Sequence, residues 1–251
     1  YAAVRKTSDT SRLKAKGVDI VVVDLSDYTL LYHQLHQLPR FDYIVHNAGV
    51  TKTNNKKDFL TVNYLYTKNF INAIVQSGNV PNKILYISSL AAYGPGSQSG
   101  EFPILADDFP MPISPYGESK LKAERLFGNQ DHLPYLIVRP TAVYGPGERD
   151  FFEAVTLINN RLEFYIGRHK QFLTFIYVKD LVRGVFDLLE SKLVNKAYFI
   201  TDGEVYDKKI FGELVAKHLN KRVLRITVPM VLAKMVASVS EKIATVQKKA
   251  T

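Results

Sequence analysis

The stretch that decides the fold is KILYISS (83–89), an apolar, β-branched run that ends in two serines. Four similar runs accompany it: YAAV (1–4), DIVVVDL (19–25), YIVHNA (43–48) and YLIVRP (135–140). Polar or amphipathic segments of helical length separate them, at 7–16, 27–37, 56–77 and 115–129. Near-continuous apolar strands that alternate with helices are typical of a parallel sheet covered on both faces. The sequence therefore predicts an α/β fold with a doubly wound parallel sheet.

The pattern loosens after about residue 145, which predicts a small C-terminal substrate lobe. Helices are expected near 150–160, at 179–191 and at 207–219, with a final helix after them. Strands are expected at FLTFIYV (172–178), KAYFI (196–200) and RVLRIT (222–227). We therefore expect residues 1–145 to form a dinucleotide-binding domain and 146–251 a mainly substrate-binding lobe interwoven with the sheet.

Composition narrows the class of protein. The 251 residues include no cysteine, which excludes disulfides, thiolate catalysis and cysteine-ligated metals and fits a cytoplasmic protein. The net charge is +9, from 33 basic and 24 acidic residues, but the basic residues are scattered, so no nucleic-acid partner is expected. The most apolar stretch, 228–239, is too short to cross a bilayer, so no membrane partner is expected and this stretch is predicted to be a packed or interface helix.

Ligands of such sheets bind beyond the carboxyl ends of the strands. The residues that follow the predicted strands should therefore line a site: Arg5, Asp24, Asn47, Ser88 with Ser89, and Pro140 with Thr141.

The segment SPYGESK (114–120) supplies the chemistry of this site. Ser114 can cap a helix and Pro115 suits its first turn, which places Tyr116 and Lys120 one turn apart on one face. An ammonium and an oxidised nicotinamide both favour the phenolate, so we expect the pKa of Tyr116 to fall below its usual value of about 10. Tyr116 then exchanges a proton with a substrate hydroxyl, while a serine hydroxyl at the end of 83–89 binds the carbonyl oxygen. The spacing of Tyr116 and Lys120 alone occurs by chance in many helices, so the argument depends on the combination.

The combination resembles the extended short-chain dehydrogenases/reductases, the group of NAD(P)-dependent epimerases, dehydratases, dihydroflavonol-type reductases and 3β-hydroxysteroid dehydrogenases. ISSLAAYG (87–94) and PYGESK (115–120) carry the catalytic motifs, and the resemblance covers nearly the whole chain. It implies a Rossmann-like fold with Ser89 as the catalytic serine and Tyr116 as the acid/base. Lys120 is implied to bind the nicotinamide ribose and to depress the tyrosine pKa.

Further segments match the family: VDL (23–25), HNAGV (46–50), RPTAVYGPG (139–147) and FIYVKDLVRGV (175–185). The implied cofactor-binding residues are Arg5, Asp24, Leu25, Asn47, Ala48, Gly49, Asn63, Ser88, Lys120, Pro140 and Thr141. The implied substrate-binding residues are Tyr93, Tyr144 and Arg149. In this family, helices matching 56–77 and 115–129 often form a four-helix interface, so a homodimer is expected.

One family element is missing from the sequence. The family begins with a strand and a Gly-x-x-Gly-x-x-Gly turn that holds the pyrophosphate, and the sequence contains no such turn. YAAVRK (1–6) matches the end of the family's second strand, so we expect one βα unit of about 30 residues to be absent here.

The cofactor preference is read from residues 3–8, AVRKTS. NAD-preferring members carry an acidic residue at the end of this strand, whereas Arg5, Lys6, Thr7 and Ser8 suit a 2′-phosphate. NADP(H) is therefore favoured and NAD(H) is possible. A solvated basic turn is the alternative interpretation.

The substrate is expected to be a small molecule with an apolar body. Sugar-nucleotide epimerases usually carry an arginine where this chain has Leu173, although GRHKQF (167–172) supplies other cations. Aromatic and apolar side chains that can line a pocket are Tyr93, Met111, Tyr144, Phe151, Phe152 and Phe172. No metal is expected, because His46 has no second histidine at ligand spacing and a structural role suits it better.

Three functions stay open at this point. The first is an NAD(P)-dependent oxidoreductase that transfers hydride between nicotinamide and a carbonyl or hydroxyl substrate. The second is a nucleotide-sugar epimerase or dehydratase that uses the same tyrosine. The third is a non-catalytic dinucleotide-binding regulator, which the intact Ser89, Tyr116 and Lys120 argue against.

Overall fold

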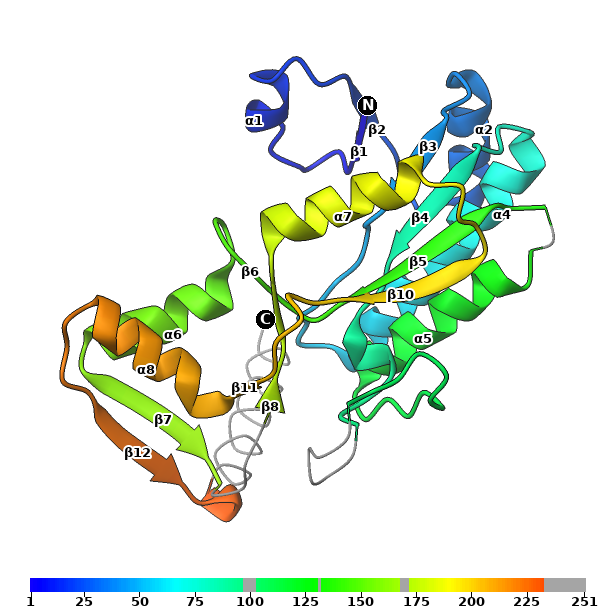
Figure 1. Ribbon diagram of the computed structural model, residues 1–251. Coiled ribbons are helices and arrows are strands. Elements are labelled where there is room, and N and C mark those ends of the chain that lie inside the picture. Colours follow the sequence, from blue (N-terminus) through cyan, green and yellow to red (C-terminus); the bar gives the residue numbers. More distant parts are fainter. Residues whose placement is uncertain (97–102, 131, 168–171, 233–251) are drawn as a thin grey trace, which may run out of the picture. The chain divides into compact units, whose positions relative to one another are not determined.

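The computed structural model describes residues 1–96, 103–130, 132–167 and 172–232 (Figure 1). The chain forms two compact units, which are described separately. The first unit comprises Tyr1–Pro95, Leu105–Pro140 and Gly184–Phe199, and the second comprises Gly96–Ile104, Thr141–Arg183 and Ile200–Thr251. The domain boundary expected near residue 145 stays a prediction.

A four-stranded sheet forms the centre of the first unit (Figure 1). Leu85 pairs with Val45 on one side and with Leu136 on the other, and both ladders are parallel. The strand order is β10 (Lys196–Ile200), β5 (Tyr135–Pro140), β4 (Lys83–Ile87) and β3 (Tyr43–His46). Burial on both faces of β4 and β5 explains why these strands read as continuous apolar runs. The predicted parallel α/β sheet is confirmed.

The first two strands form a separate ladder. β1 (Ala2–Val4) pairs in parallel with β2 (Ile20–Val22), and the short helix α1 (Ser11–Lys14) lies between them in sequence. Both predicted strands are therefore present, although each is only three residues long.

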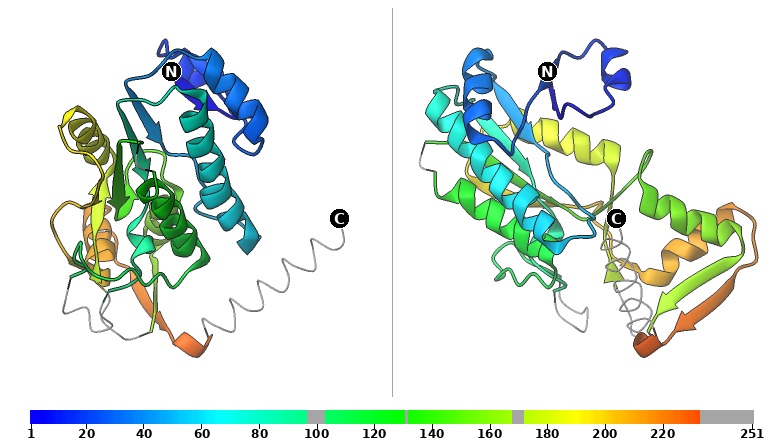
Figure 2. Two further views of the ribbon diagram at one scale, coloured as in Figure 1. Left: turned by 90° about the vertical axis from the view of Figure 1, so that its right-hand side faces the viewer. Right: turned by 180° about the vertical axis from the view of Figure 1, so that it is seen from behind.

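Helices pack against the sheet of the first unit (Figure 2). The core joins Leu31 of α2, Ile71 and Ile74 of α4, Tyr86 of β4 and Phe127 of α5, all of them at most 1% exposed. The predicted helix 56–77 begins with one helical turn and a π-helix before it becomes regular. The helices are α2 (Tyr28–Gln37), α3 (Lys56–Asp58), the π-helix η1 (Phe59–Leu65), α4 (Tyr66–Ser77), the 3₁₀ turn η2 (Leu90–Ala92), α5 (Pro115–Gly128) and α7 (Val178–Glu190).

A buried lysine anchors the end of α7 to the start of β4. The Nζ atom of Lys83 donates to the carbonyl oxygens of Leu188, Leu189 and Ser191, at 3.0, 2.9 and 2.7 Å. Carbonyl groups at a helix C-terminus lack partners within the helix and carry partial negative charge, so they suit an ammonium group. Burial lowers the pKa of Lys83, and this shell of carbonyls compensates for lost water.

The described residues of the second unit form short strand pairs, two complete helices and the first residues of α7. The parallel pairs are β6 (Ala142–Tyr144) with β9 (Phe175–Tyr177), and β7 (Leu162–Ile166) with β12 (Leu224–Val228). β8 (Phe172–Leu173) pairs in the antiparallel direction with β11 (Tyr206–Asp207). The helices are α6 (Arg149–Asn159) and α8 (Lys208–His218).

The sequence missed β6, β7 and β11 and read 172–178 as one strand, whereas Thr174 separates β8 from β9. The predicted final helix, most of 228–239 and residues 168–171 of GRHKQF lie outside the described residues. Among the residues that are described, no helix has the length and apolar character needed to cross a bilayer.

Candidate functional site

The start of α5 is fixed by a cap and by an unusually close backbone contact. The Ser114 hydroxyl oxygen accepts from the Gly117 N–H at 3.1 Å, and Pro115 occupies the first turn, as the sequence predicts. A Cβ on Gly117 would lie 2.2 Å from the carbonyl oxygen of Ala91 in η2. Only glycine therefore allows α5 to approach η2 this closely, and that approach brings Tyr116 near Ser89, the residue that caps η2.

The Ser89 and Tyr116 side chains lie close enough to interact, and this interaction acts to lower the pKa of the tyrosine. Ser89 has an extended backbone (φ −162°, ψ 151°) and also accepts from the Ala91 N–H at 3.2 Å. The Tyr116 ring meets Phe59 edge to face, with centroids 5.9 Å apart. The structure thus joins two of the three predicted catalytic groups.

Burial raises the pKa of Tyr116, and the interaction with Ser89 only partly opposes this effect. The predicted lowering of this pKa by the nearby lysine is therefore wrong for the chain without ligand. The physical reason is that the phenolate loses more hydration than the surrounding groups of the protein restore. Tyr116 is a protonated phenol at neutral pH.

Lys120 lies one turn after Tyr116 and is buried. Its Nζ atom donates to the carbonyl oxygen of Ile87 at 2.7 Å and lies 4.7 Å from the ring centroid of Tyr86. Burial lowers the pKa of Lys120 to about 8, while the negative charge of Glu124 acts in the opposite direction. The ammonium is thus held at the carboxyl end of β4, next to the two serines.

Asn63 connects the loop after β3 to α5. Its Nδ2 donates to the Val50 carbonyl and to the Ser119 hydroxyl, both at 3.0 Å, and its Oδ1 accepts from the Val50 N–H at 2.8 Å. Ser119 in turn donates to the Tyr116 carbonyl at 2.7 Å. A Cβ on Gly49 would lie 2.9 Å from Asn63 Oδ1, so the loop needs glycine there. Asn63 is fully buried, and these contacts use both ends of its amide.

The remaining predicted cofactor residues differ in exposure. Asn47, Ala48 and Gly49 are exposed at the carboxyl end of β3, and Arg5 is exposed in the turn after β1. Pro140 ends β5 and Thr141 follows it.

Asp24, Leu25 and Ser88 are engaged within the protein. Asp24 accepts from the N–H and hydroxyl of Ser26, at 2.9 and 2.6 Å, and these hydrogen bonds lower its pKa. Leu25 packs against the core, and the buried Ser88 hydroxyl donates to Glu124.

His46 has a structural environment. It is buried, its Nε2 lies 2.9 Å from the Thr67 hydroxyl oxygen, and its ring stacks on Phe70 with centroids 4.6 Å apart. Burial and then the charge of Lys120 lower the pKa of His46 to about 3, so its ring is neutral at physiological pH. In the described part of the chain, no group of three or more His, Asp or Glu side chains is placed to bind a metal.

Sequence reasoning missed an ion pair beside the predicted catalytic groups. Arg139 donates from Nε and Nη2 to the Glu124 carboxylate, with the shortest distance at 2.8 Å, and both side chains are buried. The guanidinium lies 4.4 Å from the ring centroid of Tyr93, a predicted substrate residue, whose hydroxyl donates to the Ala106 carbonyl at 3.2 Å. The sequence did contain a signal for Glu124, because this residue follows Lys120 by four positions and so lies on the same face of the helix. The signal does not indicate Arg139 as the partner of Glu124.

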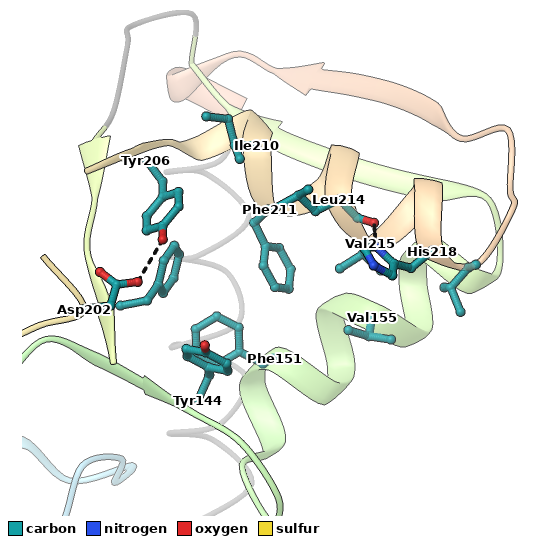
Figure 3. Close-up of a pocket in the computed structure, with 12 residues that line it drawn as sticks. Tyr144, Phe151, Val155, Asp202, Tyr206, Ile210, Phe211, Leu214, Val215 and His218 are labelled. Carbon is teal, nitrogen blue, oxygen red and sulfur yellow. Dashed lines mark hydrogen bonds between the residues drawn. The ribbon is translucent and has the colours of Figure 1, made fainter. Parts of the chain in front are cut away.

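The second unit contains an apolar pocket of about 420 Å³ between α6, α8 and the nearby strands (Figure 3). Its polar groups lie at the edges: Tyr206 donates to Asp202 at 2.9 Å, and His218 Nδ1 bonds the Leu214 carbonyl at 2.8 Å. The apolar and aromatic lining residues are Tyr144, Phe151, Val155, Phe175, Ile210, Phe211, Leu214, Val215 and Leu219.

Two of the six side chains predicted to line a pocket, Tyr144 and Phe151, do so here. Phe152 and Phe172 are exposed and are not part of this lining, and Arg149 is exposed at the start of α6. The other two, Tyr93 and the exposed Met111, belong to the first unit.

The motifs and the fold agree with a known family. The sequence model of the NAD dependent epimerase/dehydratase family matches residues 1–201, and the chain belongs to this family. This places it among the extended short-chain dehydrogenases/reductases, as the motifs indicated.

Curated relatives include a dehydrogenase and an epimerase. Human sterol-4-alpha-carboxylate 3-dehydrogenase, decarboxylating, is 30% identical over 61% of this chain and 43% of its own length. UDP-glucose 4-epimerase from Vibrio cholerae is 26% identical over 74% of this chain and 60% of its own length. The match thus spans about half the length of these relatives.

Solved structures share the fold. RMD from Pseudomonas aeruginosa, complexed with NADPH, has a TM-score of 0.71 at 24% identity, over 85% of this chain and 78% of its own. UDP-glucuronic acid 4-epimerase from Bacillus cereus, in complex with NAD, has a TM-score of 0.74 at 22% identity, over 88% and 71%.

The close approach at Gly117 leads to a first prediction. Gly117→Ala should destabilise the fold by about 1–3 kcal/mol, because the added methyl group overlaps a backbone carbonyl that cannot move independently. Gly128→Ala in the same helix is the control, since its Cβ would be 3.7 Å from the nearest atom. Urea unfolding measures both, and equal stabilities of the two variants would contradict the predicted role of the contact.

Proposed function

We propose that this protein is an NADP(H)-dependent oxidoreductase in which Tyr116 is the general acid/base. The observation that supports this most strongly is the proximity of the Ser89 and Tyr116 side chains at the carboxyl edge of a parallel sheet, with the buried ammonium of Lys120 one turn along α5. Ligands of parallel α/β sheets bind at that edge.

The proposed mechanism assigns one task to each side chain. A bound nicotinamide supplies or accepts the hydride. Tyr116, protonated at neutral pH because of its raised pKa, donates a proton to the substrate oxygen during reduction. Ser89 hydrogen-bonds the same oxygen as negative charge develops on it. In the opposite direction Tyr116 must become a phenolate, which burial disfavours, so oxidation depends on added positive charge near the ring.

The residues present fit a dinucleotide at this edge. Asn47 to Gly49 are solvent-exposed directly after β3, and Lys120 offers a cationic donor at the end of β4. Arg5 and Lys6 are exposed after β1 and suit a 2′-phosphate. These features support NADP(H) over NAD(H), with Lys120 on the nicotinamide ribose.

The substrate is proposed to be a small ketone or alcohol with an apolar body. Ten of the twelve side chains that line the pocket of the second unit are aliphatic or are those of phenylalanine and tyrosine. The carboxylate of Asp202 in this pocket repels the diphosphate of a nucleotide sugar. Leu173 stands where sugar-nucleotide epimerases usually carry an arginine, so that position supplies no cation for a diphosphate. The second candidate function is an epimerase or dehydratase that acts on a nucleotide sugar and uses the same tyrosine. The similarity to the Vibrio cholerae epimerase supports this candidate.

We further propose a homodimer that uses η1, α4 and α5. Leu60, Leu65 and Val75 are 40%, 42% and 37% exposed on η1 and α4, so these helices offer apolar side chains to a second copy of the chain. The cytoplasmic location expected from the sequence stays a prediction.

Replacement of the phenol tests the mechanism. Tyr116→Phe should lower kcat for NADPH-dependent reduction of a panel of cyclic and aromatic ketones by roughly 10²- to 10⁴-fold, the usual contribution of a positioned acid. Tyr28→Phe is the control, because it also loses one hydroxyl but only a bond to Gln76. Full activity of Tyr116→Phe would exclude Tyr116 as the acid.

Cofactor preference is tested at Arg5. Arg5→Ala should weaken NADPH binding by roughly 10-fold, the loss of one charge-assisted contact, and leave NADH binding unchanged. Lys16→Ala, a second exposed cation in the same segment, should change neither. The readout is fluorescence titration with NADPH and with NADH; an equal effect on both cofactors would contradict recognition of the 2′-phosphate by Arg5.

The dimer is tested by sedimentation velocity. Leu65→Glu should convert a dimer to a monomer, because it places a charge in an apolar interface. Phe109→Glu is the control, since Phe109 is 90% exposed and lies outside the proposed helices. A monomeric parent protein at tens of micromolar would rule out the proposal.

A further inference from the structure

The face of α5 that carries Tyr116 and Lys120 also carries an acidic residue that has no role in the mechanism above. Tyr116, Lys120 and Glu124 follow one another at intervals of four residues, so they lie in one row along the helix. Glu124 is only 5% exposed, which is unusual for a carboxylate and requires partners.

The partners of Glu124 come from two strands of the sheet. From β5, Arg139 donates to both carboxylate oxygens. From the end of β4, the buried Ser88 donates its hydroxyl hydrogen to Oε1. The carboxylate therefore connects one helix to two neighbouring strands.

Ser88 is the neighbour of Ser89 in the chain. Ser88 donates to Glu124 and Ser89 interacts with Tyr116, so both serines are held to the same helix. The bond to Ser88 therefore fixes the end of β4 against α5, and with it the separation of the two hydroxyls.

We propose that Glu124 is a positioning residue of the active site: it holds the end of β4, and so Ser89, against the helix face of Tyr116, and it supplies the negative charge that faces Lys120. This inference rests on the proposed catalytic roles of Ser89, Tyr116 and Lys120.

The surroundings of Lys120 single out Glu124 as its acidic partner. The titratable groups that face Lys120 are His46 from β3, Tyr86 from β4, and Tyr116 and Glu124 from α5 itself. His46 is neutral and both phenols are protonated at neutral pH, which leaves the carboxylate as the charge that favours the ammonium. Arg139, from β5, pairs with the same carboxylate and partly neutralises it.

The test measures how rate and stability depend on pH. In Glu124→Gln the alkaline limb of kcat, with NADPH and the ketone panel, should move to lower pH by about one unit, because the charge that favours the ammonium is gone. We assign this alkaline limb to the loss of the Lys120 proton, because the pKa of Lys120 is about 8. Tyr116 loses its proton only at higher pH, because its pKa is raised above the usual value. An unmoved limb would overturn the electrostatic part of the proposal.

Two conservative variants separate position from charge, and they keep the test open if Glu124→Gln does not fold. Ser88→Ala and Glu124→Asp both retain a carboxylate at position 124, so the alkaline limb of kcat should stay at the same pH. The value of kcat should nevertheless fall by roughly 10- to 100-fold, because Ser89 is misplaced. Unchanged kcat in both would overturn the positioning part. Glu163→Gln, which removes a buried carboxylate paired with Arg225 in the second unit, is the control and should change neither quantity.

A second measurement is independent of activity. The unfolded chain binds the Lys120 proton up to a pH near 10.5 and the folded chain only to about 8, so the free energy of unfolding rises with pH in between. Lys83, whose pKa is also lowered by burial, makes the free energy of unfolding rise with pH in the same way. The contribution of Lys120 is therefore obtained by subtracting the pH dependence of the Lys120→Met variant from that of the protein with Lys120.

In Glu124→Gln this Lys120-dependent rise should begin at lower pH than in the parent protein, and an unchanged onset would contradict the inference. If no variant, including the parent protein, reduces any ketone, the proposed function fails, while the unfolding data still decide whether Glu124 supplies the charge that favours the Lys120 ammonium.

Discussion

The close approach of α5 to η2, at Gly117 and Ala91, is the constraint on which the site depends. A side chain at position 117 would separate the two segments, and with them the hydroxyls of Tyr116 and Ser89. The cap from Ser114 and the amide bonds of Asn63 fix the same end of α5 from other directions. The site is thus held mainly by backbone contacts and buried hydrogen bonds, which are more rigid than exposed side-chain pairs.

Burial decides the charge states in this site. Each pKa unit corresponds to about 1.4 kcal/mol, so the shift of Lys120 to about 8 represents a few kcal/mol that the fold spends to bury an ammonium. The same burial holds Tyr116 as a phenol. The free chain therefore favours proton donation, and a neighbouring positive charge is needed before the tyrosine accepts a proton.

The sequence predicted most of the first unit because its signals are local. Runs such as KILYISS combine continuous apolar character with a polar end, and SPYGESK carries its own cap and first-turn proline. The short strands of the second unit were missed because three to five residues of mixed polarity, as in LEFYI, do not differ from loop sequence. The π-helix at 59–65 was missed because its hydrogen-bond register depends on contacts such as those of Asn63.

In the candidate site, too, residues with a local sequence signal were predicted, whereas residues that depend on distant contacts were missed. Tyr116 and Lys120 were predicted from their spacing and Ser89 from the family resemblance, but the contacts of Glu124 with Arg139 and Ser88 depend on pairing between a helix and two strands that are distant in sequence. For the chain without ligand, the direction of the Tyr116 pKa was predicted wrongly because spacing reveals a neighbouring charge but not the depth of burial.

The most direct test is an NMR titration of protein labelled with ¹³C at the tyrosine Cζ atoms, with Tyr116→Phe used to assign the signal. In the free protein Tyr116 should titrate above its usual pKa, and addition of NADP⁺ should lower that pKa. A Tyr116 that titrates at or below the usual value in the free protein, or a signal that NADP⁺ leaves unmoved, would contradict the proposed site.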